Sequence, residues 1–263
     1  MHTELFDYEF NAAGALDIGK KRESNEDHVI TCPGLGFFAV TDGLGGLAHG
    51  GKTSEIISEV MPEIAEGIAE EFDGMKAGPE QYGAALTDRV RQVSDNIFDT
   101  VNTASIDFGA TLSCVWLIDE AAVYVNLGDS RGYLLPRYGR TLKQVTFDHN
   151  LAGELIMLGE FTKEEMRGHP ASSRLTQFMG MPAPARPDLF IETVKPGDRI
   201  LLCSDGLCGM LTDHEILGLI RAGRQPETTA GSLIESANRA GGYDNISVVC
   251  ITVGQTRYKE NTK

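Results

Sequence analysis

The 263-residue sequence predicts an α+β fold, in which short antiparallel strands are combined with amphipathic helices. Three apolar, β-compatible runs follow one another at residues 112–118, 121–127 and 132–135. The segments between them are too short for a helical crossover, so we expect neighbouring strands to be antiparallel. Before these runs, apolar residues recur every three or four positions over two stretches of helical length. The short connections exclude a doubly wound parallel sheet for this part of the chain.

Two amphipathic helices are predicted in the first half of the chain. The first follows Gly51, and we expect Thr53 or Ser54 to cap its start. Its apolar face is formed by Ile56, Val60, Ile64 and Ile68. The apolar face of the second helix is formed by Leu86, Val90, Val93, Ile97 and Val101. Both faces require an apolar partner such as a sheet.

The remaining segments are assigned by their polarity and periodicity. Residues 1–13 are interpreted as a polar lead-in. Residues 150–186 have little apolar periodicity and are expected to form a mobile excursion, called here the flap segment. Residues 226–240 predict a helix and residues 246–253 the last strand. The polar tail, about residues 255–263, is expected to fray.

Composition limits the classes of function. A chain of this length, with 41% apolar residues, fits a single domain over residues 1–263. The net charge of −15 makes DNA or RNA a poor partner. Five cysteines without a secretory signal predict free thiols and a cytoplasmic protein, and no apolar run is long enough to predict a membrane span.

Four acidic residues lie where apolar runs end. Asp42 follows the run of residues 37–40, and Asp129, Asp205 and Asp244 occupy similar places. A carboxylate at the end of a buried strand is costly unless a cation or hydrogen bonds meet it. The pattern therefore predicts one shared cation site. Carboxylate ligands without a His or Cys cluster favour Mn²⁺ or Mg²⁺.

Two such ions would form a hydrolytic centre suited to a phosphate ester. They lower the pKa of a shared water molecule and clamp the attacked group. An arginine is then needed for the phosphoryl oxygens, and Arg22 in the charged segment 20–27 is the candidate. One Asp-Gly pair at a strand end is more often structural, and residues 129–131 are equally compatible with a simple hairpin turn. The four acids together favour the metal site.

The order of these motifs resembles the metal-dependent PP2C-type serine/threonine protein phosphatases (the PPM family) in their compact bacterial form. The matching segments span about residues 15–253, nearly the whole chain. They are residues 17–27 (DIGKKRESNED), 40–46 (VTDGLGG), 109–111 (GAT), 127–131 (LGDSR), 146–149 (TFDH), 203–207 (CSDGL) and 242–249 (GYDNISVV).

The resemblance implies roles for individual residues at the metal centre. Asp42 would bridge two ions, and the Gly43 carbonyl would bind one of them. Asp205 and Asp244 would bind the other. Glu26 would act through ordered water molecules.

A third ion and the substrate are also implied. Asp129, together with Asp205, matches the third metal position of bacterial members. Arg22 would hold the substrate phosphate, so Arg22 and Asp42 are the expected catalytic residues.

The resemblance also implies the architecture and the reaction. The fold would be a four-layer α-β-β-α sandwich of two antiparallel sheets with helices outside, and the flap segment would lie beside the active site. The reaction would be hydrolysis of phosphoserine and phosphothreonine by a hydroxide bridging two Mn²⁺ or Mg²⁺ ions. The partners would be phosphorylated substrates of a serine/threonine kinase, and we expect a monomer that binds neither nucleic acid nor membrane. A pseudophosphatase that only binds and a phosphatase for small metabolites are the alternatives.

The sequence departs from the family pattern just after the first Asp-Gly. Leu47 stands where the family usually has histidine, and Gly51 where it has glutamate. Neither position is a metal ligand in the family, so activity is still expected. Leu44 replaces a histidine proposed as general acid in some animal members.

Overall fold

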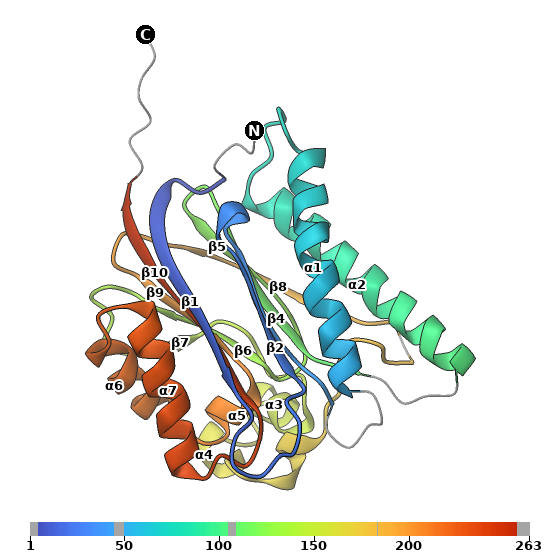
Figure 1. Ribbon diagram of the computed structural model, residues 1–263, viewed down its shortest axis with the longest axis vertical. Helices are drawn as coiled ribbons and strands as arrows, with labels where there is room; N and C mark the ends of the chain where they lie inside the picture. Colours follow the sequence, from blue (N-terminus) through green and yellow to red (C-terminus); the bar gives the residue numbers. More distant parts are fainter. Residues whose placement is uncertain (1–4, 45–49, 105–108, 183, 257–263) are drawn as a thin grey trace.

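Two five-stranded antiparallel sheets packed face to face form the centre of the structure, and helices cover both outer faces (Figure 1). The computed structural model describes residues 5–44, 50–104, 109–182 and 184–256. The predicted four-layer α-β-β-α sandwich is confirmed.

The strand order places the first and last strands of the chain side by side. The first sheet has the order β1 (Tyr8–Asp17), β10 (Ile246–Thr256), β9 (Arg199–Cys203), β6 (Arg131–Leu135) and β7 (Lys143–Gln144). The second has the order β2 (Asp27–Cys32), β3 (Phe37–Asp42), β4 (Leu112–Ile118), β5 (Ala121–Leu127) and β8 (Asp188–Thr193). All paired strands are antiparallel.

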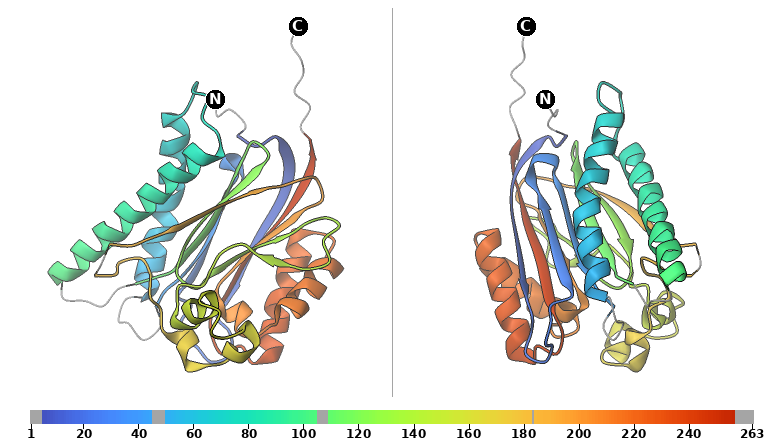
Figure 2. Two further views of the ribbon diagram at one scale, coloured as in Figure 1. Left: turned by 180° about the vertical axis from the view of Figure 1, so that it is seen from behind. Right: turned by 45° about the vertical axis from the view of Figure 1, so that its right-hand side comes forward.

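The helices fall into three groups (Figure 2). The second sheet is covered by α1 (Gly50–Glu71) and α2 (Pro79–Ala104), and the first by α6 (Asp213–Ala222) and α7 (Pro226–Ala240). Three short helices, α3 (Leu151–Met157), α4 (Lys163–Met166) and α5 (Asp205–Cys208), lie at one end of the sandwich. Short 3-10 turns occur at Pro33–Leu35 and Pro170–Ser173. Among the described helices, none combines the length and apolarity that a membrane span requires.

Strand β3 shows why the strand sequences are continuously apolar. Phe37 and Ala39 belong to the core between the second sheet and its helices, whereas Phe38 and Val40 belong to the core between the sheets. Because both faces of the strand are buried, both sets of alternating side chains are apolar. A third core joins the first sheet to α6 and α7.

The start of the chain differs from the prediction. Residues 1–13 are predicted to be a polar lead-in, yet β1 begins at Tyr8 and pairs with β10 along its length. Phe6 and Tyr8 are buried between the sheets. The polar residues that obscured the strand, such as Glu9 and Asn11, alternate with these apolar ones. A two-residue period over a single edge strand is a weak signal.

The connection after β5 also differs from the prediction. The strands β4 and β5 form the expected antiparallel pair, but β6 lies in the other sheet. Residues 128–130 carry the chain from one sheet to the other, with Gly128 at a φ of 120°. They are therefore not a hairpin turn. Their crossing brings Asp129 into the interior, where it is only 8% exposed.

Two further boundaries are corrected. Helix α1 begins at Gly50, so Thr53 and Ser54 both lie inside it and neither is the predicted cap. The end of the flap segment is part of the core, because Met179 is fully buried and its backbone pairs with that of Ala110. The edge strand β8 that follows was not predicted, since its residues are mostly half-buried.

Substituting Trp116 with alanine is expected to lower the free energy of unfolding by about 3–5 kcal/mol. The ring is fully buried, packs edge-on against Phe37 and Tyr82, and its Nε1 donates to the Leu35 carbonyl at 2.9 Å. Urea denaturation measures the change. Tyr138→Ala is the control, since this ring is 85% exposed and its loss should change stability by about 0.5 kcal/mol or less. A loss below about 1 kcal/mol for Trp116→Ala would contradict the packing described.

Candidate active site

The acidic residues named from the sequence come from four separate strand ends and lie at the same end of the sandwich. Asp42 closes β3 and faces Asp27, the first residue of β2, across the strand pair. Asp205 begins α5 directly after β9. Asp244 precedes β10, and Asp129 lies between β5 and β6.

Close backbone contacts bring Asp205 and Asp244 together. A Cβ atom on Gly206 would collide with the carbonyl oxygen of Asn245, and one on Gly19 would collide with that of Asp244. Gly19 also has a φ of 78°, which favours glycine. Because Gly19 and Gly206 have no side chain, the loops that carry them can both pack against the loop of Asp244.

Asn245 fixes the loop that carries Arg22 and Glu26. Its Nδ2 donates to the carbonyls of Ile18 and Ser24, both at 2.9 Å, and its Oδ1 accepts from the Glu26 N–H at 2.9 Å. The side chain is almost completely buried. A buried amide with all these bonds made is a rigid support.

Thr111 plays the same part for Asp42 and Asp129. Its Oγ1 accepts from the Asp42 N–H at 3.2 Å and lies 2.6 Å from the Oγ of Ser130. The Thr111 N–H donates in turn to the Asp42 carbonyl at 2.8 Å. The predicted motif at residues 109–111 thus joins the end of β3 to the crossing after β5.

Burial and mutual repulsion raise the pKa values of the clustered carboxyls. The pKa of Asp42 is raised well above its usual range by burial and by the charges of Asp27, Asp205, Asp129 and Asp244. That of Asp205 is raised for the same reasons. Burial is the largest cause for Asp27 and Asp129, whose pKa values rise to about 6. So many carboxylates in one place require cations to be stable in the ionised form.

Several oxygen atoms of the cluster have no partner in the protein. Asp205 Oδ1, Asp27 Oδ1 and Glu26 Oε2 are buried without a hydrogen bond from the described residues. Unpartnered buried oxygens are costly, and hard anionic oxygens are the ligands that Mg²⁺ and Mn²⁺ prefer. The donor set therefore fits divalent ions of this kind.

Arg22 brings a positive charge to the cluster. Its Nη2 lies 2.7 Å from Oδ2 of Asp244, with both side chains about one-third exposed. Among the described residues, no group of three or more acidic, histidine or cysteine side chains is arranged closely enough to hold a metal ion. Arg22 thus contacts Asp244, which is a predicted metal ligand. Contact between Arg22 and a substrate stays a prediction.

Gly43 and Glu26 are neighbours. The Gly43 N–H donates to the Glu26 main-chain carbonyl at 3.1 Å, so the main chains of these two predicted site residues are joined. Gly51 lies against Glu26, and a Cβ at Gly51 would be 3.3 Å from Glu26 Cγ. The other departure, Leu47, and the glycines at positions 45 and 46 lie outside the described residues.

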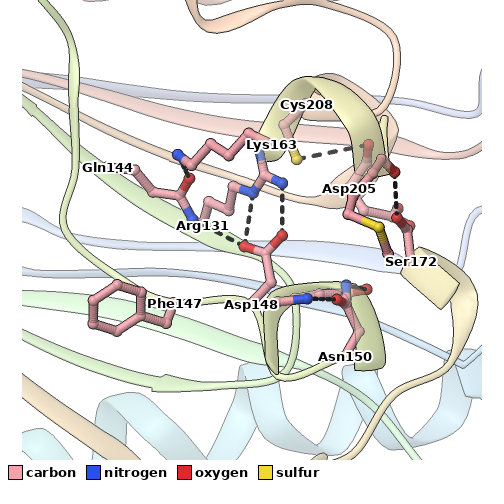
Figure 3. A network of polar contacts seen from close by, with 12 residues as sticks. Arg131, Gln144, Phe147, Asp148, Asn150, Lys163, Ser172, Asp205 and Cys208 are labelled. Carbon is pink, nitrogen blue, oxygen red and sulfur yellow. Dashed lines mark hydrogen bonds and ion pairs between the residues drawn. The ribbon is translucent and has the colours of Figure 1, made fainter. Parts of the chain in front are cut away.

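Arg131 and Asp148 form the best-defined ion pair beside the site (Figure 3). The guanidinium donates from Nε and Nη2 to the two carboxylate oxygens of Asp148, at 2.8 and 2.6 Å. Gln144 donates to the same carboxylate at 2.9 Å. The charge of Arg131 is therefore neutralised by Asp148 within the structure.

The family profile described as protein phosphatase 2C matches residues 20–231. The chain belongs to the protein phosphatase 2C family. The matched range contains all the acidic residues discussed above except Asp244, which follows it.

Relatives of known name and structure agree with this family. The serine/threonine phosphatase stp of Listeria monocytogenes is 30% identical over 241 residues, which cover 89% of this chain and 92% of that protein. The structure of the PPM Ser-Thr phosphatase MsPP from Mycobacterium smegmatis, in complex with cacodylate, is 32% identical with a TM-score of 0.77 and covers 93% of this chain and 98% of that one. The catalytic domain of the phosphatase PstP, solved with two manganese ions, is 29% identical with a TM-score of 0.77 and covers 94% and 99%.

Sequence reasoning missed two residues that this protein phosphatase 2C site depends on. Asp27 lies in the motif of residues 17–27 and Asn245 in that of residues 242–249, but no role was predicted for either. Asp27 pairs with Ser204, whose Oγ donates to it at 2.8 Å. The signal that could have revealed Asn245 is its place between an acid and a strand start, where a buried amide can tie loops together.

Substituting Asp129 with asparagine is expected to stabilise the metal-free protein at pH 7.5 by about 1–3 kcal/mol. The pKa of Asp129 is raised by burial from its ordinary value of 3.8 to about 6. Its contribution to stability is therefore present below pH 4 and is lost as the pH rises through about 6. Urea denaturation in EDTA at pH 4 and pH 7.5 measures both values.

The gain should shrink to about 0.5 kcal/mol at pH 4, where Asp129 is protonated in the folded state and about half protonated in the unfolded state. Asp95→Asn, an exposed substitution on α2, is the control and should change stability by about 0.5 kcal/mol or less at either pH. A gain of equal size at both pH values would show that charge is not the cause.

Proposed function

We propose that this chain is a Mn²⁺- or Mg²⁺-dependent protein phosphatase that hydrolyses phosphoserine and phosphothreonine. The observation that carries the proposal is the cluster of carboxylates in a member of the protein phosphatase 2C family, with Asp205 Oδ1 buried and lacking a partner in the part of the chain that the structure describes. The named relatives are serine/threonine phosphatases, and the PstP structure contains two manganese ions. No loop with a cysteine followed six residues later by arginine occurs at Cys203 or Cys208, which disfavours a cysteine-based mechanism.

The ions would be held by residues already in one place. Asp42 would contact both of two ions, with the Gly43 carbonyl on one and Asp205 and Asp244 on the other. When bound, the ions supply Lewis acidity, which activates water and neutralises charge on the phosphoryl group. Their positive charge also compensates the repulsion that raises the pKa values of Asp42 and Asp205.

Glu26 and Asp129 have supporting roles in the proposal. Glu26 has a buried oxygen without a partner among the described residues and would orient water molecules at the centre. Asp129, close enough to Asp205 to raise its pKa, would share a third ion with it.

Arg22 would bind the phosphoryl oxygens of the substrate. Its guanidinium is partly exposed and points into the cluster at Asp244. A guanidinium presents several N–H donors in one plane, so it can contact Asp244 and a phosphate together. This contact would hold the phosphoryl group beside the acidic cluster in one orientation.

The leaving alkoxide needs a proton, and the residue that follows Gly43 cannot supply it. Leu44 occupies that position and cannot donate a proton. We assign this proton to water within the site. The substrate would be a phosphorylated protein of a serine/threonine kinase, and the chain would act as a cytoplasmic monomer.

Asp42→Asn and Asp205→Asn should each abolish phosphatase activity almost completely, because each removes an anionic ligand. The assay is Mn²⁺-dependent phosphate release from a phosphothreonine peptide and from p-nitrophenyl phosphate. The control is the surface variant Asp95→Asn, which should keep the parent activity. Parent protein that binds Mn²⁺ and the phosphopeptide without turnover would indicate a pseudophosphatase, and activity confined to small phosphate esters would contradict a protein substrate.

Arg22→Ala should raise KM for the phosphopeptide by about ten- to a hundredfold, because a charge-assisted contact to phosphate is lost. The effect on kcat should be smaller. Arg239→Ala removes an exposed arginine on α7, which pairs with Glu235, and serves as the matched control. An unchanged KM for Arg22→Ala would exclude Arg22 from substrate binding.

A further inference from the structure

Asn150 joins the flap segment to Asp129. It is 3% exposed, and it lies at the start of α3, next to Asp148 (Figure 3). Its Nδ2 donates to Oδ2 of Asp129 at 3.2 Å. Its Oδ1 accepts from the Gly153 N–H at 2.8 Å and caps the helix. One amide group therefore serves both the acidic cluster and the first turn of the flap.

The backbone beside Asp129 is already fixed by other groups. The Gly128 carbonyl accepts from Asn126 Nδ2 at 3.1 Å and from the His149 N–H at 3.0 Å. The Gly128 N–H donates to His149 Nδ1 at 3.2 Å. With the main chain held in this way, the freedom that remains at Asp129 is rotation of its carboxylate.

No other side chain of the described residues donates a hydrogen bond to that carboxylate. Arg131 is near enough to lower the pKa of Asp129, but its Nε and Nη2 donate to Asp148. The bond from Asn150 likewise favours the ionised form of Asp129. Among the described side chains, Asn150 is therefore the one that orients the carboxylate, together with a hydrogen bond from the main chain of Asp129 itself.

We propose that Asn150 is a positioning residue, which orients Asp129 for a divalent cation and couples binding of that cation to the first turn of the flap segment. The inference rests on the proposed function, because it requires Asp129 to be a ligand. Groups that hold a metal ligand by hydrogen bonds commonly change metal affinity by about ten- to a hundredfold when removed. If the Asp129 carboxylate rotates toward an ion, Asn150, which bonds to it and caps α3, must shift with it.

Two substitutions separate the two bonds of Asn150. Asn150→Ser keeps an oxygen that can cap α3 but is too short to reach Asp129, whereas Asn150→Ala removes both bonds. Asp129→Asn identifies which Mn²⁺ site depends on Asp129. Thr162→Ala is the matched control, since Thr162 caps the neighbouring flap helix α4 through hydrogen bonds with Glu165.

The readout is Mn²⁺ binding without turnover, measured by the electron paramagnetic resonance signal of free Mn²⁺, together with Tm. Asn150→Ser and Asn150→Ala should both weaken the Asp129-dependent site by about tenfold. Only Asn150→Ala should lower Tm, by about 2–4 °C, because only it loses the cap. Thr162→Ala should lower Tm and leave Mn²⁺ binding unchanged.

The outcomes distinguish this inference from the proposed function. If Asp129→Asn weakens one Mn²⁺ site and Asn150→Ser binds Mn²⁺ as the parent does, the role of Asn150 is overturned and the metal site stands. If Asp129→Asn leaves Mn²⁺ binding unchanged, Asp129 is no ligand, and both its assignment and the inference fail.

Discussion

Repulsion among buried carboxylates is the constraint on which the rest of the structure depends. Asp42 lies at a point where the charges of four other aspartates raise its pKa. Such a cluster destabilises the folded chain unless cations neutralise it, since like charges at close range cannot all stay ionised in a buried site. In the structure described, the guanidinium of Arg22 meets one of these acids, Asp244. Divalent ions are the natural complement to the others.

The fold tolerates this cluster because buried, hydrogen-bonded side chains hold the loops that carry it. Asn245 ties the loop of Arg22 to the start of β10, and Thr111 ties the end of β3 to the crossing after β5. Both are almost completely buried, and both use main-chain partners that do not titrate. The loops that carry the acids are thus held rigidly, while carboxylate oxygens such as Asp205 Oδ1 have no partner among the described residues and can bind a cation. A site of this kind is preorganised for cations before they bind.

The flap segment is joined to this framework more closely than its polar sequence indicates. Met179 packs in the core beneath α1 and α2, and Asn150 contacts Asp129 directly. Between these two anchors, a small apolar cluster of Ala152, Met166 and Ala171 holds the short helices together. The segment is therefore part of the surroundings of the site, and its first turn shares a hydrogen-bonded group with the acids.

The sequence by itself determined the α+β class, the long helices, most of the strands and the acids at the strand ends, because these depend on local periodicity and on residue type. The four-layer sandwich and the individual ligand roles came from the family resemblance. Only the tertiary structure decided that β6 leaves the sheet of β5, that residues 8–17 form a strand, and that Asn150 reaches Asp129. Each of these depends on partners distant in the chain: β1 pairs with β10, and the crossing at Gly128 packs on Thr111. Local sequence cannot specify such pairs, because the free energy that selects them comes from contacts formed only when the layers close.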